Sequence, residues 1–194
     1  MANGFLSQTQ LELSIANMAP PPVPQPPPGG QAIIIVNQTQ FSLSPIDQFF
    51  DSGEFAVAPL PISPFNSGSF IVTPTSSGTA GVTGAVAFTF EPLPSVICNL
   101  GAGFGNPLFG SFDCNVAFDA DHNQIVNSNP ILPLGDFTQG TYNANSTSPV
   151  FSSSTQYAGT DTNGSPTIIQ ITGNSTPAFV ASIIITQTIV SGGQ

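Results

Sequence analysis

The sequence contains no lysine, no arginine and no tryptophan in 194 residues. Average usage would give a chain of this length roughly 20 or more basic residues, so their complete absence is not a chance fluctuation. Ten Asp and Glu residues set the formal net charge at −10, and only His122 and the amino terminus can carry a positive charge. The chain can therefore form almost no internal salt bridges.

The missing basic side chains exclude two classes of partner. Proteins bind nucleic acid largely by releasing counterions with Lys and Arg, so we expect no nucleic-acid partner. Electrostatic docking to anionic lipid needs the same side chains and is excluded by the same argument. Surface polarity has to come from Ser, Thr, Asn and Gln, and such a surface repels copies of itself only weakly. These features favour an extracellular or cell-surface protein.

Long hydrophobic runs are also missing. No segment reaches the roughly 18 uninterrupted apolar residues of a membrane span, so we expect no membrane insertion. Residues 1–30 have no positively charged start, and their first apolar stretch is interrupted by polar residues, unlike a secretory signal peptide. Hydrophobic residues still make up 40% of the chain, which indicates a packed core.

Only two cysteines are present, Cys98 and Cys114, at the ends of the glycine-rich segment CNLGAGFGNPLFGSFDC. A disulfide closing this segment would stabilise the fold by about 3 kcal/mol in the chain-entropy model. We predict that bridge, with two buried thiols as the alternative. Two cysteines and one histidine cannot build a closed zinc site without carboxylates.

One acidic stretch has the spacing of a cation site. In FDADHNQ, residues 118–124, Asp119, Asp121 and Asn123 follow the order that opens a calcium-binding loop. An EF-hand would continue with Gly at position 124 and Glu at position 130, where this chain has Gln124 and Pro130. The alternatives are a turn rich in Asp and Asn, or a looser calcium site that uses backbone carbonyls. Calcium is the only cofactor that the sequence suggests.

Signals for an enzyme are weak. The tripeptide Asp51-Ser52-Gly53 resembles the catalytic stretch of aspartic peptidases, which need two aspartates that share a proton. No second D-[ST]-G is present, although a homodimer could supply one. Acid hydrolysis by Asp51, or by a pair such as Asp119 and Asp121, is the enzymatic alternative. We predict that the protein is not an enzyme.

The most distinctive segment is rich in proline. Residues 20–30 read PPPVPQPPPGG, with seven prolines in the first nine positions, which predicts polyproline II spanning about 28 Å. In residues 1–19, Leu11, Leu13 and Ile15 alternate with polar residues, as expected of a strand. The sequence therefore predicts a strand-forming arm (1–19), a linker (20–30) and one domain (31–194).

From residue 31 onward, short apolar or alternating runs recur between turn signals. Val86, Phe88 and Phe90 share one face of such a run, and sixteen phenylalanines supply core volume. This pattern predicts an all-β sandwich, jelly-roll-like in plan. The predicted strands are Ala32–Asn37, Gln40–Leu43, Glu54–Leu60, Ser69–Thr73, Gly84–Glu91, Ser95–Leu100, Ser111–Asp119, Gln124–Asn127, Asp136–Tyr142, Val150–Tyr157, Pro166–Thr172 and Phe179–Val190.

Two stretches carry a resemblance to a known family. IIIVNQTQFSL, residues 33–43, and GTAGVTGAVAFTF, residues 78–90, resemble the first half of aegerolysin-like lipid-binding β-sandwiches. That resemblance implies a lipid-binding β-sandwich. The tryptophan-containing elements of that family have no counterpart here, so we do not assign the chain to it.

The arm carries the functional hypothesis. A single strand is not stable in water, so an exported strand with Leu11, Leu13 and Ile15 is expected to complete the sheet of another copy. One-way donation propagates into a filament unless it closes into a ring. We therefore predict a structural subunit of an extracellular filament, appendage or coat, with copies of itself as partners. The alternatives are a viral capsid or spike protein, and a secreted lectin-like or lipid-binding module that uses the Gly/Phe loop 99–112.

Overall fold

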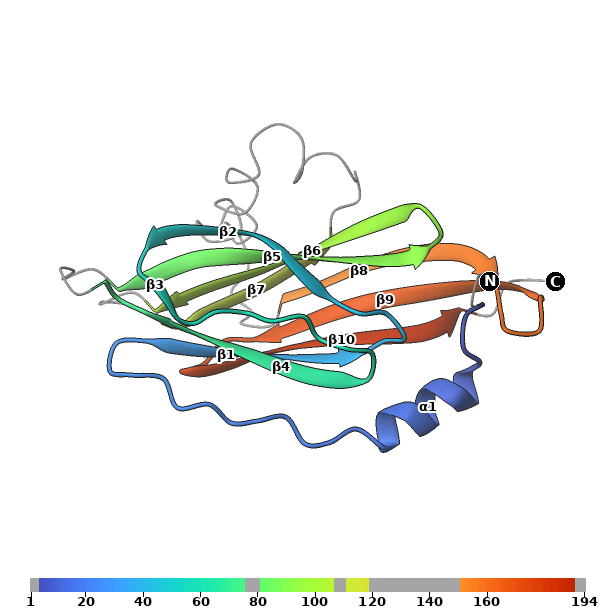
Figure 1. The fold of residues 1–194 in the computed structure, drawn as a ribbon, viewed down its shortest axis with the longest axis horizontal. Helices are drawn as coiled ribbons and strands as arrows, with labels where there is room; N and C mark the ends of the chain where they lie inside the picture. The colour runs from blue at the N-terminus through green and yellow to red at the C-terminus, as the bar shows by residue number, and fades with distance from the viewer. Residues whose placement is uncertain (1–3, 76–80, 107–110, 119–150, 191–194) are drawn as a thin grey trace.

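The computed structural model describes residues 4–75, 81–106, 111–118 and 151–190, and in it the chain forms two packed β-sheets with one short helix (Figure 1). The all-β sandwich predicted from the sequence is confirmed. The helix is α1 (Gln8–Ala16). The strands are β1 (Gln31–Gln38), β2 (Ser44–Ser52), β3 (Glu54–Val57), β4 (Asn66–Thr73), β5 (Val82–Leu93), β6 (Val96–Asn106), β7 (Asp113–Phe118), β8 (Phe151–Thr160), β9 (Pro166–Thr176) and β10 (Val180–Val190).

The larger sheet has the strand order β3-β4-β1-β10-β9-β8, and the smaller one has the order β2-β5-β6-β7. In the larger sheet the two central strands, β1 and β10, run parallel, with Ile35 opposite Ile183. The other strand pairs of this sheet are antiparallel. A parallel pair has to be covered on both faces, which agrees with the unbroken apolar run of β1. This pair also distinguishes the sandwich from a jelly roll built of antiparallel strands alone.

The core lies between the two sheets and is rich in phenylalanine, as predicted. Val86, Phe88 and Phe90 all point into it, with at most 4% of any of these side chains exposed. The rings of Phe70 and Phe104 meet edge to face with centroids 5.7 Å apart, which joins the larger sheet to the smaller one. The alternation read from the sequence therefore identified the buried face of β5 correctly.

The sequence missed one strand and overpredicted another. β2 was not predicted because SPIDQFFDS does not alternate cleanly and contains a proline and two aspartates. It lies at the edge of its sheet and has two register irregularities, which is where sheets tolerate such residues. The predicted strand Gln40–Leu43 is wrong, since only Leu43 forms a bridge, to Ile62. The predicted strands Gln124–Asn127 and Asp136–Tyr142 lie outside the described residues.

The predicted strand-forming arm is wrong, because residues 8–16 form the helix α1. Ser7 caps its N-terminus, and the Ser7 and Gln10 side chains form a capping box. Leu11 and Ile15 are four residues apart and share one helix face, so the spacing read as strand alternation also fits a helix. Leu11 is buried at 1% exposure, whereas Leu13 points to solvent at 64%.

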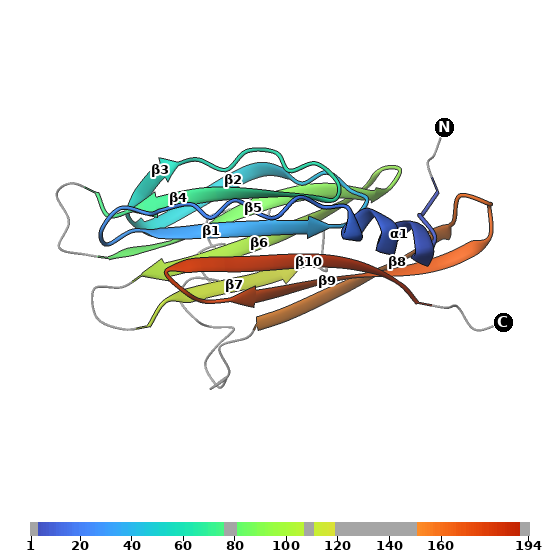
Figure 2. The same ribbon diagram turned by 90° about the horizontal axis from the view of Figure 1, so that it is seen from below.

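The arm and linker pack on their own domain. Both views show residues 7–30 running along the outer side of the larger sheet, past β1 and β10 (Figures 1 and 2). Phe5 enters the core at one end, and the Asn106 side-chain amide donates to the carbonyls of Gly29 and Gly30 at the other. Ile34, on the outer face of β1, is only 7% exposed. In this structure the proline-rich segment therefore lies along the outer side of its own domain's larger sheet.

Candidate functional site

The residues predicted to donate a strand do not form a site. Leu11 packs against the chain's own body, Leu13 is exposed, and Ile15 is half-buried in the last part of the helix. Their backbone hydrogen bonds are used within α1, so none of them can pair with a sheet edge in this conformation.

The calcium prediction is not tested by the structure. Asp119, Asp121 and Asn123 all lie outside the described residues. Within the ranges that the structure does describe, no group of three or more His, Cys, Asp or Glu side chains is close enough to hold a metal ion.

The predicted disulfide is not formed. Cys114 lies opposite Phe104 on β6, and Cys98 lies six residues further along that strand. Six residues of strand span about 20 Å, whereas a disulfide needs the two Cα atoms within about 7 Å. Both thiols are buried at 0% exposure. Burial, with a smaller contribution from the neighbouring Asp113 carboxylate, raises the pKa of the Cys114 thiol to about 12, so this thiol is protonated and unreactive at neutral pH.

This arrangement predicts the outcome of a thiol assay. Without any reductant, denatured protein is expected to take up two maleimide labels per chain, and native protein none over the same time, because both sulfur atoms are buried. Mass spectrometry of the labelled chain counts the additions. If the denatured chain takes up no label, Cys98 and Cys114 do form a disulfide.

The Asp51-Ser52-Gly53 tripeptide has a structural explanation. It joins β2 to β3, which belong to different sheets, and the Ser52 hydroxyl donates to the carbonyl of Gly81 at 2.8 Å. Gly53 has φ +96°, and a Cβ there would lie 2.5 Å from the Val82 side chain. The sequence of this corner is therefore accounted for by the passage between sheets. Asp51 is exposed, on the edge strand β2.

The predicted contact loop 99–112 is largely not a loop. Residues 99–106 belong to β6, where they pair with β5 and β7, and residues 107–110 lie outside the described residues. Gly101, Gly103 and Gly105 are buried strand residues, and Phe104 is a core side chain at 1% exposure. A binding surface has to be sought elsewhere.

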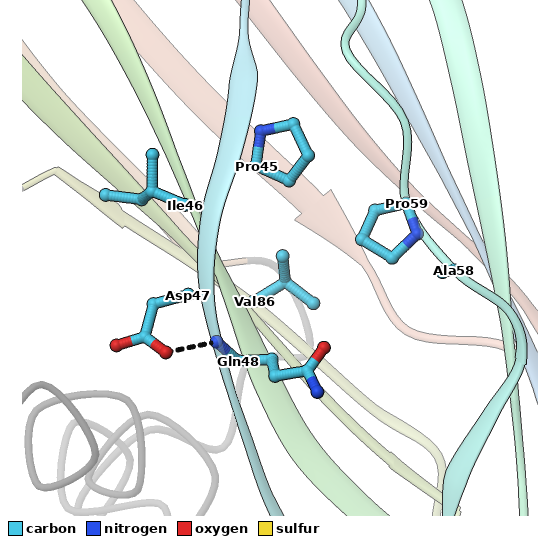
Figure 3. Close-up of a pocket in the computed structure, with 7 residues that line it drawn as sticks. All are labelled: Pro45, Ile46, Asp47, Gln48, Ala58, Pro59 and Val86. Atoms are coloured by element: carbon cyan, nitrogen blue, oxygen red, sulfur yellow. Dashed lines mark hydrogen bonds between the residues drawn. The ribbon is translucent and has the colours of Figure 1, made fainter.

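One hollow lies on the side of the sandwich where β2 and β3 form the edges of their sheets. A cavity of about 280 Å³ opens there between β2 and the segment that follows β3 (Figure 3). Pro45 and Gln48 point from β2 toward Pro59 across the opening, and Val86 lies between them (Figure 3). Asp47 points to the other side of the strand, where its carboxylate accepts the Gln48 backbone N–H at 2.8 Å.

Large aliphatic side chains are exposed on the two chain segments that border this hollow. Ile46 is 46% exposed, Val57 48% and Leu60 73%, all unusually high for large aliphatic residues. We call this surface the apolar edge, and it consists of Pro45, Ile46, Val57, Ala58, Pro59 and Leu60. Sequence reasoning missed it because residues 57–60, VAPL, were assigned to a longer strand Glu54–Leu60, in which alternate residues would have been buried. The two prolines among PLP, residues 59–61, were the signal that the strand ends earlier.

A second hollow of about 290 Å³ is lined by Ser42, Ser44, Thr89, Phe90, Glu91 and Ile97, the last of which is 54% exposed. The Glu91 carboxylate accepts the Ser95 backbone N–H at 2.7 Å, which holds it in the turn between β5 and β6. This hollow has no pair of side chains arranged for acid–base chemistry.

No helix in the described part of the chain is long and apolar enough to cross a membrane.

Comparison with known proteins supports the fold. No protein-family model matches the sequence, and no curated protein matches it. Among solved structures, the chain is similar to the crystal structure of the lipid binding protein Nakanori, with a TM-score of 0.52 and 13% sequence identity. The match covers 93% of this chain and 80% of that one. At this identity the likeness establishes a shared β-sandwich fold and nothing about shared ligands.

Proposed function

We propose that the protein is a non-enzymatic, extracellular binding module that attaches to a neutral lipid surface through its apolar edge. The observation that carries this proposal is the exposure of Ile46, Val57 and Leu60, each about half exposed or more, on the two segments that border a hollow at one side of the sandwich. Clustered exposed apolar side chains with polar neighbours mark interaction surfaces.

The charge of the chain selects the kind of lipid. Asp47, Asp51 and Glu54 lie on β2 and β3, beside the apolar edge, and the whole chain has no Lys or Arg to offset them. An anionic membrane would repel this surface over about a Debye length. A zwitterionic or uncharged lipid surface would not, and it would accept the aliphatic side chains at the level of its headgroups. One solved structure with this fold, Nakanori, is described as a lipid binding protein, which also supports the proposal.

Vesicle flotation tests this proposal. The protein is expected to float with phosphatidylcholine vesicles, and less of it when half of the lipid is phosphatidylserine, because the added negative charge repels a chain of net charge −10. High salt should restore binding to the mixed vesicles by screening that repulsion. If the protein stays in the dense fraction with every composition, or prefers phosphatidylserine, the proposal is wrong.

Assembly into a filament, coat or capsid is a prediction that these observations do not test. The residues expected to donate the strand, Leu11, Leu13 and Ile15, lie in a helix. Electron microscopy of the purified protein would decide between polymers, shells and single particles.

A further inference from the structure

One long strand edge is nearly unpaired by the residues that the structure describes. β8 pairs with β9 in continuous register over residues 151–160, without a bulge. Among the described residues only Phe5 pairs with the other side of β8, at its end: the Phe5 N–H donates to the Thr160 carbonyl at 2.8 Å, and the Phe5 carbonyl accepts the Thr162 N–H at 3.1 Å. The described part of the chain thus pairs only with the last residues of this edge.

The Phe5 contact also fixes which backbone groups face outward. The Thr160 carbonyl points away from β9, and in a strand successive residues direct their N–H and C=O groups to opposite sides. Ser152, Ser154, Gln156 and Ala158 therefore point their backbone donors and acceptors toward the open edge. Their side chains are exposed as well.

Two other edges of the sandwich, β3 and β2, are protected, whereas β8 shows no such protection among the described residues. β3 is four residues long, with an irregularity and Glu54. β2 carries Pro45, Asp47 and Asp51 and has two irregularities. Short length, proline, charge and bulges are the devices by which proteins prevent strand pairing at an edge. β8 is ten residues long and has none of them: its sequence, FSSSTQYAGT, lacks proline and charge.

We propose that β8 pairs antiparallel with β8 of a second copy about a two-fold axis, which joins the two larger sheets into one. Ser, Thr and Gln side chains would face one another across the junction, with no like charges opposed. The acidic residues Asp47, Asp51 and Glu54 lie on β2 and β3, and β3 is at the opposite end of the larger sheet, so the approaching copies keep them apart. A two-fold contact of this kind closes as a dimer.

The dimer is tested by sedimentation velocity at increasing protein concentration, with the full chain and two variants at Ser154. Ser154→Pro removes an N–H directed at the open edge and leaves the pairing with β9 in place. Ser154→Lys places like charges near the axis. Thr188→Lys is the matched control, because it adds the same charge at an exposed position of β10, an interior strand.

Wild type is expected to sediment as a dimer, and each Ser154 variant to raise the dimer dissociation constant by about tenfold or more, since each change occurs twice per dimer. Thr188→Lys should leave the dissociation constant within about twofold of wild type. Circular dichroism checks that each variant is folded. If Ser154→Pro does not fold, Ser154→Lys alone tests the dimer. A wild type that is monomeric at every concentration overturns the proposal. So do open-ended polymers, or a dimer that both Ser154 variants leave intact.

Discussion

Replacing Phe5 with alanine is expected to lower the free energy of unfolding by about 3–5 kcal/mol, the range for removing a buried phenylalanine. Phe5 is 2% exposed and belongs to the core, although it precedes the helix and the proline-rich segment. Its ring meets Phe41 edge to face, with centroids 6.5 Å apart, and lies so close to Gly159 that a Cβ there would be 2.8 Å from it. Alanine would leave a cavity at this end of the sandwich.

Leu13→Ala is the control for that measurement. Leu13 belongs to the same N-terminal segment but is 64% exposed, so its truncation should change the free energy of unfolding by no more than about 0.5 kcal/mol. Urea denaturation followed by circular dichroism gives both values. If Phe5→Ala is as stable as Leu13→Ala, the N-terminal residues are not part of the fold, and a detachable arm becomes the better description.

The triple variant Ile46→Ser, Val57→Ser, Leu60→Ser is expected to weaken binding to phosphatidylcholine vesicles by about a thousandfold. Each aliphatic side chain that leaves water on binding contributes about 1.4 kcal/mol, which is a factor of ten in affinity. Leu60→Ser alone should lower the affinity by about a factor of ten. This side chain is 73% exposed, so its replacement should change the stability of the fold little. Vesicle titration monitored by flotation gives the partition constants.

Ile184→Ser is the matched control for the lipid variants. Ile184 is also an exposed aliphatic residue, at 39%, but it lies on β10 in the interior of the larger sheet. It is expected to bind vesicles as wild type does. Equal losses in Ile184→Ser and Leu60→Ser would mean that general hydrophobicity drives the binding, and that the apolar edge has no special part in it.

Local pattern was sufficient for the fold class and for much of the core. Alternation in β5 predicted that Val86, Phe88 and Phe90 share one face, and all three are buried. Such a pattern reports which face of a strand is apolar, and burial of that face drives sheet packing. The absence of Lys and Arg is likewise read from the sequence alone, and our expectation of a lipid partner without net negative charge is based on it.

Pairing and chain direction needed the tertiary structure. The alternation of Leu11, Leu13 and Ile15 fits a strand, and the spacing of Leu11 and Ile15 fits a helix equally well. In the structure the segment is a helix, which Ser7 caps and which packs against β10. Cys98 and Cys114 flank a segment short enough to bridge, yet the register of β6 against β7 separates them. Which strand edges are left open, and which exposed aliphatic residues meet at one side of the sandwich, depends on sheet order. Sequence separation only weakly constrains sheet order, because strands far apart in the chain also pair, as β1 and β10 do here.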